Sequence, residues 1–147
     1  MPPPKTPPQK GFTLIELIIV VAMIAILASI SIPKFASLLR KASEGAALGN
    51  LGSLRSALHI YYADREGRYP ATITGLTVGG KYLTTVPRTK TPNYHADADA
   101  EVLLTGSPAP TDAGGWYYND APGGSSYGSA LVNCTHTDTK GRVWSAY

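Results

Sequence analysis

Residues 11–33 read GFTLIELIIVVAMIAILASISIP, and this stretch decides the fold. From Phe12 to Ile32 the run holds 21 residues and a single charge, that of Glu16. As a helix it would be about 31 Å long, close to the thickness of the hydrocarbon core of a bilayer. The pattern predicts a helix that lies in a membrane or in a bundle of equally apolar helices.

The acid at position 16 separates the possible interpretations of this run. A secretory signal peptide has an apolar core of roughly 7–15 residues, which is shorter than the run here and does not include an acid. An ordinary membrane anchor gains nothing from a carboxylate, which costs roughly 2.5–3.5 kcal/mol at the bilayer centre. Glu16 therefore indicates a partner for its charge, although it could also extend to the membrane interface.

The segment ahead of the run, residues 1–10, contains five prolines and two lysines and no acid. Followed by Gly11, Phe12 and the sequence TLIE, it resembles the processing site of type IV pilins and type II secretion pseudopilins. The resemblance extends from Lys5 to about Pro70. It implies that a prepilin peptidase cuts between Gly11 and Phe12 and methylates the new N-terminal Phe12. It also implies that Glu16 pairs with the Phe12 amine of a neighbouring subunit during assembly, although the spacing alone also allows a pair within one chain.

The helical pattern continues well beyond the apolar run. Pro33 removes one backbone hydrogen bond, so we expect a helix break near Ser29 to Pro33 in the assembled state. The helix should then continue to about Asp64. One side carries an apolar stripe at helical spacing. The stripe consists of Leu48, Leu51, Leu54, Leu58 and Tyr62.

A second stripe of this helix is made of small residues and contains the pair Gly45 and Gly49. Glycines spaced by four residues allow two helices to approach closely. Each glycine in a helix costs about 1 kcal/mol relative to alanine, which close packing against a neighbour would offset. The pair predicts a helix-packing surface, with a locally loosened helix as the alternative.

The remaining residues, 64–147, are polar and rich in turns. Short runs of Tyr, Trp and Val between Gly, Pro, Asn and Asp predict strands. The resemblance implies that residues after Tyr69-Pro70, around Leu76 to Pro87, fold back over the helix. We expect four strands that form one antiparallel sheet on the distal half of the helix: Glu101–Leu104, Gly115–Asn119, Ser129–Cys134 and Arg142–Ala146.

The expected fold class is therefore α+β and pilin-like, a long N-terminal helix packed on a small antiparallel sheet. We expect four segments along the chain. They are a cleaved leader (1–11), a transmembrane or filament-core helix (12–33), an amphipathic helix half (34–63) and a globular head (64–147).

Composition argues against several classes of protein. Charged residues make up 16% of the chain, below the quarter or so that is typical of soluble domains. The net charge is +3, but Lys5 and Lys10 lie ahead of the cut, which leaves 11 basic against 10 acidic residues. No basic patch for nucleic acid follows from this balance. After the helix too little chain remains for an enzyme with a deep cleft.

We expect no catalytic residues, no cofactor and no metal site. The segment Gly124–Gly128 matches G-x-S-x-G, but a nucleophile elbow needs a strand before it and a helix after it, and this segment is a flexible loop. His59, His95 and His136 lie far apart along the chain and lack the spacing of zinc ligands. The single cysteine, Cys134, excludes an intramolecular disulfide and is expected to be a buried, inert thiol.

Alternating acids at Asp97, Asp99 and Glu101 are the remaining metal candidate. The resemblance lends this some weight, because a major pseudopilin of type II secretion carries calcium in its C-terminal loops. However, these acids lie at or before the start of the first expected strand, not in the final loop, and they lack the carboxylate pattern of an EF-hand. We therefore expect no metal at these acids.

The predicted function is that of a structural subunit of a type IV pilus-like filament, which serves adhesion, motility or DNA uptake. Its partners would be further copies of the chain in a helical filament, the prepilin peptidase and an assembly platform in the bacterial inner membrane. The alternatives are a major pseudopilin of type II secretion, located in the periplasm, and a membrane-anchored extracytoplasmic binding domain that never polymerises.

Overall fold

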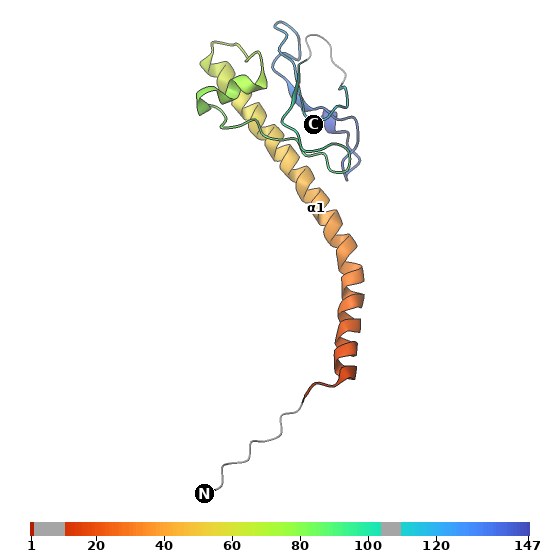
Figure 1. Cartoon of the computed structure of the whole chain (residues 1–147). Helices are drawn as coiled ribbons and strands as arrows, with labels where there is room; N and C mark the ends of the chain where they lie inside the picture. Colours follow the sequence, from red (N-terminus) through yellow and green to blue (C-terminus); the bar gives the residue numbers. More distant parts are fainter. Residues whose placement is uncertain (2–10, 104–109) are drawn as a thin grey trace. The chain divides into compact units, whose positions relative to one another are not determined.

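The computed structural model describes Met1, residues 11–103 and residues 110–147. These residues form two compact units, Met1–Leu38 and Leu39–Tyr147. The element order is one long α-helix, then short strands and 3-10 helices, as Figure 1 shows. Most of the predicted leader lies outside the described residues. The α-helix, α1, spans Leu14–Asp64, which confirms the predicted helix end.

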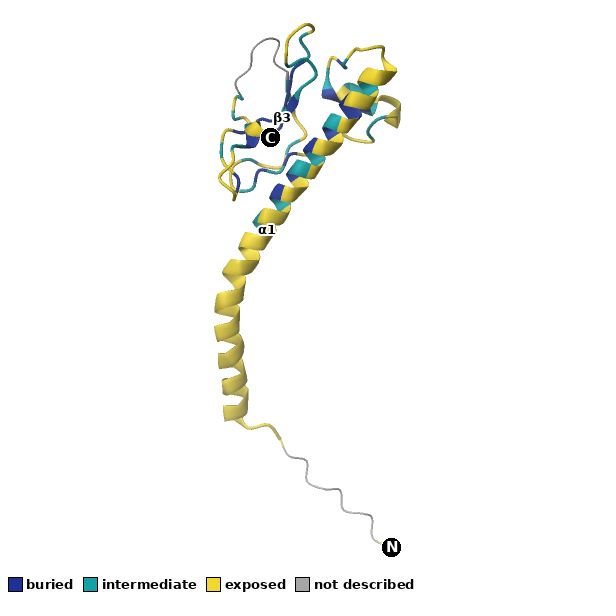
Figure 2. Ribbon diagram, turned by 180° about the vertical axis from the view of Figure 1, so that it is seen from behind, coloured by how far each residue is buried: buried dark blue, intermediate teal, exposed yellow. Residues whose placement is uncertain are grey.

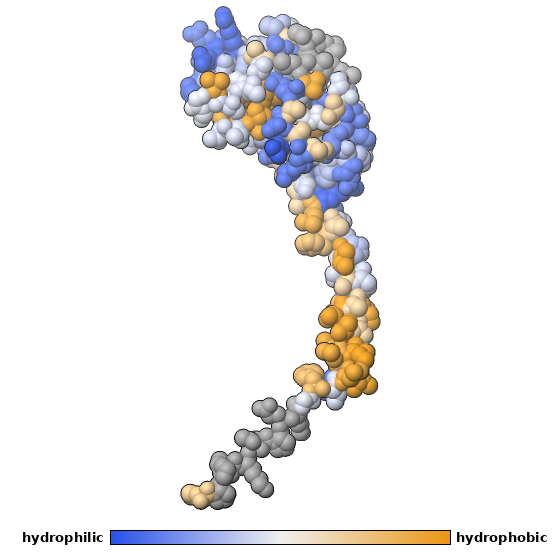
Figure 3. Space-filling model, in the orientation of Figure 1, coloured by the Kyte–Doolittle hydropathy of each residue, from blue (hydrophilic) through white to orange (hydrophobic). Residues whose placement is uncertain are grey.

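In the first unit α1 buries none of its side chains. Every residue from Gly11 to Leu39 is exposed (Figure 2), and large apolar side chains such as Leu14 and Ile32 are 76% and 68% exposed. Orange apolar atoms cover much of the lower half of this helix in Figure 3. By length and composition α1 contains one stretch that could cross a membrane, none of which is buried within the chain.

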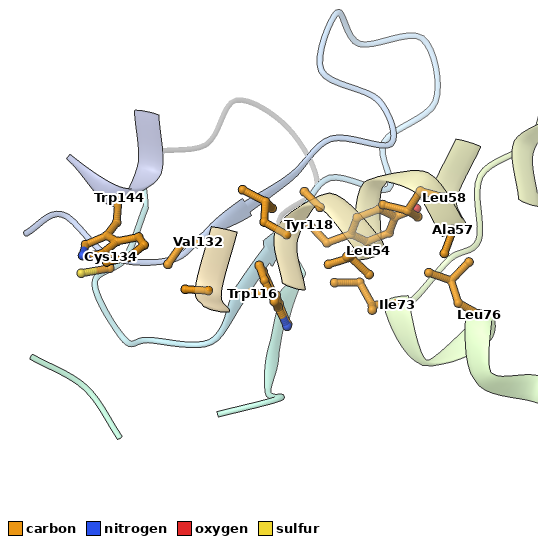
Figure 4. Close-up of a cluster of buried hydrophobic side chains, with 13 residues drawn as sticks. Leu54, Ala57, Leu58, Ile73, Leu76, Trp116, Tyr118, Val132, Cys134 and Trp144 are labelled. Carbon is orange, nitrogen blue, oxygen red and sulfur yellow. The ribbon is translucent and has the colours of Figure 1, made fainter. Parts of the chain in front are cut away.

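In the second unit one face of α1 becomes the wall of a hydrophobic core. Leu51, Leu54 and Leu58 of the predicted apolar stripe are at most 3% exposed, and Ala47 and Ala57 lie beside them. This confirms the stripe, although Tyr62 at its end is exposed. Figure 4 shows Leu54 and Leu58 beside Tyr118 from the sheet, and Trp116 packs in the same cluster.

The chain after the helix folds back over it, as expected. The 3-10 helix η1 (Ile73–Gly80) places Leu76 in the core with no exposed surface. The Leu83 N–H then donates to the Leu76 carbonyl at 3.2 Å, and Leu83 packs on the core. Further along, the indole N–H of Trp116 donates to the carbonyl of Pro87 at 2.6 Å, which ties this connection to the sheet.

The sheet has three strands in the order β1-β2-β3: Glu101–Leu103, Trp116–Tyr118 and Ala130–Val132. The prediction of a purely antiparallel sheet is wrong, since β1 pairs with β2 in parallel and only β2 and β3 are antiparallel. The physical reason is the connection. Residues 104–115 provide the dozen or so residues that a parallel return requires, whereas an antiparallel hairpin needs a short turn. The α+β fold class itself is confirmed.

The fourth predicted strand, Arg142–Ala146, is also wrong. Only an isolated bridge pairs Val143 with Thr137, and the chain then forms the 3-10 helix η2 (Trp144–Ala146). One oxygen of the Asp138 carboxylate accepts the N–H groups of Lys140 and Arg142 at 2.8 and 2.9 Å. This side-chain acceptor closes a local turn and takes backbone donors that a longer strand would need for pairing.

Two polar side chains of α1 fasten the rest of the second unit to the helix. The guanidinium of Arg55 donates twice to the carbonyl of Ala130, at 2.9 and 3.1 Å, and once to the main-chain oxygen of Tyr147 at 2.6 Å. Three turns earlier, the carboxylate of Glu44 accepts the Thr139 N–H at 3.0 Å and the Thr139 hydroxyl at 2.5 Å. These contacts span up to 95 residues of sequence and fix the sheet on one face of α1.

The core contact of Leu54 gives a first prediction. Replacing Leu54 by Ala should destabilise the second unit by about 2–5 kcal/mol, since it leaves a cavity in a fully buried site. Thermal unfolding of the detergent-solubilised chain, followed by the near-ultraviolet circular dichroism of its tryptophans, measures this. The matched control is Ile60→Ala on the same helix, where the side chain is 56% exposed and the effect should stay within about 0.5 kcal/mol. Equal losses in both variants would contradict the assigned face.

Gly115, which precedes β2, gives a second prediction. It has a φ of 74°, and a Cβ there would lie 2.4 Å from the carbonyl oxygen of Ala100. Gly141 has a similar φ of 80° but open space around it. Gly141→Ala should therefore cost only the left-handed backbone strain of about 1–2 kcal/mol, while Gly115→Ala should cost clearly more because the clash adds to the strain. Denaturant unfolding of both variants compares them, and a smaller loss at Gly115 would overturn the assigned contact.

Candidate functional site

The predicted cleavage bond lies ahead of the helix in irregular backbone. Gly11 and Phe12 precede the first residue of α1, Leu14, and both are exposed. The Phe12 side chain is 85% exposed, and a Cβ placed at Gly11 would have no described atom within 4 Å. Among the described residues, none covers the bond between these two residues.

Thr13 and Glu16 form a capping box at the start of α1. One oxygen of the Glu16 carboxylate accepts the Thr13 N–H at 2.8 Å and the Thr13 hydroxyl at 2.7 Å. In return, the Glu16 N–H donates to the Thr13 hydroxyl oxygen at 3.3 Å. Two of the N–H groups that lack partners at every helix start are thereby satisfied. The motif T-x-x-E thus has a local structural role in addition to its place in the processing signal.

The predicted pair between Phe12 and Glu16 requires a cut chain. In the uncut chain the nitrogen of Phe12 is a peptide N–H, and the Glu16 carboxylate points to Thr13 instead. After a cut before Phe12, the new ammonium would stand four residues from the carboxylate. The pair stays a prediction for the processed chain.

Pro33 lies inside α1, and the helix is continuous from Leu14 to Asp64 in the single chain. The expected break concerned the assembled state, so it also stays a prediction. Pro33 cannot donate a backbone hydrogen bond, so the carbonyl four residues before it lacks its usual helical donor. A helix opens more easily at such a position than where every backbone hydrogen bond is made.

Gly45 and Gly49 face away from the core. Both are exposed, and a Cβ at either position would meet no described atom within 4 Å. The neighbours Glu44 and Ala47 are buried, so the glycines lie on the opposite side of the helix from the head's own contacts. The surface is free for another helix, and the predicted helix packing stays a prediction.

Comparison with known proteins places these features in a family. Residues 7–32 match the family model of the prokaryotic N-terminal methylation motif. Over 82 residues the chain is 42% identical to the fimbrial protein EcpC of Eikenella corrodens, a match that covers 53% of each chain. It is 38% identical over 91 residues to the type II secretion system core protein G of Pectobacterium carotovorum, covering 60% of this chain and 55% of that protein.

Over about half of its length the chain is thus similar both to type IV fimbrial proteins and to type II secretion core protein G, and it carries the N-terminal methylation motif. A third relative, the type IV major fimbrial protein FimA of Dichelobacter nodosus, is 43% identical over 61 residues, covering 41% of this chain and 39% of FimA. The chain thus spans about half the length of the curated relatives it matches. No solved structure matches it.

The segment that matches G-x-S-x-G lies in a turn and not at a junction between a strand and a helix. The segment Gly124–Gly128 lies in the turn between β2 and β3, where a nucleophile elbow would need a following helix. The Ser126 hydroxyl oxygen accepts the Asn119 side-chain amide at 3.0 Å, which gives it a role in closing the turn.

The three alternating acids do not converge on a common point. Asp97 pairs with Lys90 and Asp99 with Arg88, each at 3.8 Å. The carboxylate of Glu101 instead accepts the backbone N–H of Ile73 at 2.8 Å, and its burial raises the pKa of that carboxyl. The interpretation of these acids as a calcium loop is not supported by this arrangement.

Two of the three histidines do come together, contrary to their distance in sequence. His95 and His136 lie with ring centroids 5.6 Å apart, on either side of Asp112. The nearest nitrogens of the two rings are 3.2 and 3.3 Å from the same Asp112 oxygen. The sulfur of Cys134 lies 3.6 Å from His136 Nδ1.

Sequence reasoning missed this cluster because the tertiary fold assembles it. The available signal was Cys134-x-His136, since alternate residues of an extended segment point to the same side. His59 lies elsewhere, with its ring nitrogen 3.5 Å from the Tyr69 hydroxyl. The Thr135 backbone N–H donates to Asp112 at 2.8 Å and holds the pKa of that carboxyl at about 2, so Asp112 is anionic at neutral pH.

Cys134 matches its expected environment. Its side chain is fully buried and belongs to the core cluster that includes Trp144, beside which Figure 4 draws it. Burial raises the pKa of the Cys134 thiol, which is therefore protonated at neutral pH in the free chain. Its sulfur nevertheless reaches the histidine cluster at the edge of the core.

Proposed function

We propose that this chain is the structural subunit of a type IV pilus-like filament, made as a prepilin and assembled through the N-terminal half of α1. The observation that carries this is the contrast within one helix. Its first half exposes a continuous apolar surface directly after the methylation motif, and its second half is the wall of a folded head. An apolar surface of this extent needs lipid or protein around it. Lipid covers it before assembly, and neighbouring copies cover it in the filament.

Processing prepares the helix for assembly. A prepilin peptidase cuts the exposed bond between Gly11 and Phe12 and methylates Phe12. The cut replaces the polar leader, residues 1–11, by one ammonium group close to the Glu16 carboxylate. In an apolar filament core neither charge is stable alone, whereas an ammonium–carboxylate pair offsets much of the desolvation of both. The pair thereby favours one axial register between neighbouring helices.

The proposal assigns a place to each segment and partner. Residues 12–33 span the bacterial inner membrane and later form the filament core, with the expected break at Pro33. Residues 34–63 are the amphipathic half, and residues 64–147 form the head on the filament surface. An inner-membrane assembly platform supplies the energy for extension, and the partner along the filament is a further copy of the same chain.

The relatives named as type II secretion core protein G favour a second candidate, the major pseudopilin of a type II secretion system. Processing, membrane insertion and helix packing are the same in both candidates. They differ in whether the filament extends from the cell surface or stays in the periplasm. A membrane-anchored domain that never polymerises is the third candidate.

Intact-mass spectrometry of the subunit separates these candidates. Filaments are sheared from the surface of native cells, and both the sheared material and the membranes are measured. The proposal expects a sheared subunit with the mass of residues 12–147 plus one methyl group. A processed, methylated subunit found only in the membranes would favour the pseudopilus. An uncut chain would overturn the proposed processing.

The capping box allows the charge of Glu16 to be tested apart from its hydrogen bonds. Glu16→Gln keeps a side-chain acceptor for the Thr13 N–H but removes the charge. Thr13→Val keeps the charge and the side-chain shape but removes the hydroxyl. If the charge pair drives assembly, Glu16→Gln should reduce sheared filaments at least about tenfold, while Thr13→Val should reduce them far less.

The subunit mass serves as the control in this comparison, because it shows whether each variant is still cut and methylated. The opposite ranking, with Thr13→Val the more damaging variant at normal processing, would show that the cap and not the charge governs assembly.

The open glycine face gives a further prediction. Gly45→Ala combined with Gly49→Ala should stabilise α1 in the unassembled chain by up to about 1 kcal/mol at each position, since alanine has the higher helix propensity. The same change should lower filament yield, because two methyl groups would separate helices that pack there. Unfolding of the detergent-solubilised chain and the amount of sheared filament measure the two effects.

Ser53→Ala is the matched control, because it raises helix propensity on an exposed position without adding bulk. Normal filament yield from the double glycine variant would remove this face from the packing surface. An equal loss with Ser53→Ala would assign the effect to a stiffer helix.

A further inference from the structure

Four potential metal ligands from three separate segments meet at one point of the second unit. His95 comes from the connection between η1 and β1, Asp112 from the segment ahead of β2, and Cys134 and His136 from the segment after β3. One ligand atom of each side chain lies within 4.8 Å of those of all the others. This convergence is independent of the processing and assembly features at the other end of the chain.

The distances agree with the edges of a tetrahedron around one ion. Zinc–nitrogen and zinc–oxygen bonds of about 2.0–2.1 Å place neighbouring ligand atoms about 3.3 Å apart, and a zinc–sulfur bond of about 2.3 Å gives a sulfur–nitrogen edge of about 3.6 Å. The observed separations from Asp112 Oδ1 to the nitrogens of His95 and His136 are 3.2 and 3.3 Å, and the sulfur of Cys134 lies 3.6 Å from His136 Nδ1. Three of the six edges therefore already have the lengths that a tetrahedral ion requires.

We propose that His95, Asp112, Cys134 and His136 form a binding site for one divalent transition-metal ion of the zinc type. Two imidazoles, a thiolate and a carboxylate are ligands that Zn²⁺ accepts in a closed tetrahedral site. The two negative ligands neutralise the charge of the ion, which suits a position at the edge of the core. Binding releases the proton of the Cys134 thiol to solvent, because the thiolate is the form that coordinates.

The surroundings hold these ligands in place from outside the cluster. The Tyr94 ring stacks on the His136 ring at 4.1 Å with an interplanar angle of 13°. The carbonyls of Cys134 and His136 accept the N–H groups of Ser145 and Trp144 at 3.2 and 3.0 Å. Such supporting contacts orient metal ligands before the ion arrives and thereby raise affinity.

Glycine at position 114 permits the approach of the first ligand. A Cβ at Gly114 would lie 3.0 Å from the Cβ of His95, and the residue has a φ of 78°. The backbone two residues after Asp112 therefore passes close to His95. Asp112 has a φ of 59°, a conformation that aspartate adopts more readily than most residues.

A bound ion would add a direct link between three segments that hydrogen bonds and ring contacts already join. Because Cys134 is the single cysteine, the chain cannot form an intramolecular disulfide. A bound metal ion is therefore the strongest link between the three segments that these side chains can provide. The donor set also selects among metals. Thiolate and imidazole favour Zn²⁺ over Ca²⁺, which prefers six or more oxygens.

Metal titration of the full-length, detergent-solubilised and reduced chain tests the proposal. After removal of metals with a chelator, Zn²⁺ is titrated against a chromophoric competitor, and Co²⁺ is used as a spectroscopic probe. We expect one Zn²⁺ per chain, a rise in thermal stability on binding and no displacement by excess Ca²⁺. The Co²⁺ complex should show the intense visible absorption of tetrahedral coordination and a thiolate-to-cobalt charge-transfer band.

Three variants test three of the proposed ligands, and a fourth variant is the control. His95→Gln and His136→Gln should each weaken Zn²⁺ binding at least about tenfold. Cys134→Ala should remove the charge-transfer band. The matched control is His59→Gln, which changes a histidine outside the cluster and should leave binding unchanged.

Near-ultraviolet circular dichroism checks that each variant is folded. Should the buried Cys134→Ala fail to fold, the two half-buried histidines carry the test. Zinc binding that is equally tight in wild type, His95→Gln and His136→Gln would overturn the proposal, as would a weak, octahedral Co²⁺ spectrum without a thiolate band.

Discussion

The structure depends on one helix that has to satisfy two different environments. The first part of α1 presents apolar side chains on every side, and by length and composition it could cross a membrane. Its second part buries a single stripe, centred on Leu54, under the sheet and the fold-back connection. The change comes where the sequence passes from an unbroken apolar run to a period of 3.6 residues. The sheet is too small to form a core without the helix, because only three residues of each strand pair.

Local patterns in the sequence predicted the helix, its end at Asp64 and the face that it buries, because each follows from the spacing of neighbouring residues. The fold-back over the helix came from the family resemblance. Features that depend on contacts between residues far apart in the sequence could not be predicted in this way. The parallel pairing of β1 with β2 is a contact between segments separated by a dozen residues of sequence, and the turn that replaces the fourth strand depends on where the Asp138 carboxylate points. The cluster around Asp112 could not be seen because its two histidines are brought together only when β3 pairs with β2.

Glu16 shows how one acidic residue can serve two stages of the same protein. In the uncut chain it caps the helix through Thr13, so the carboxylate already has hydrogen-bond partners within the apolar run. In the processed chain the proposal gives it an ammonium at Phe12. A residue with a local role and an intermolecular role cannot be interpreted from a single substitution, which is why charge and capping have to be changed separately.

The two polar side chains of α1 that bind the rest of the head have a consequence for symmetry. Glu44 and Arg55 are eleven residues apart on α1, which is close to three full turns. Their side chains therefore lie on the same side of the helix, where both accept or donate hydrogen bonds to the rest of the head. Rotation of the head about the helix axis would break contacts at both points. The azimuth of the head is therefore set by the helix itself. In any helical array of such subunits, the angle from one head to the next would repeat the angle between their helices, and the pattern of surface loops would report the packing of the core.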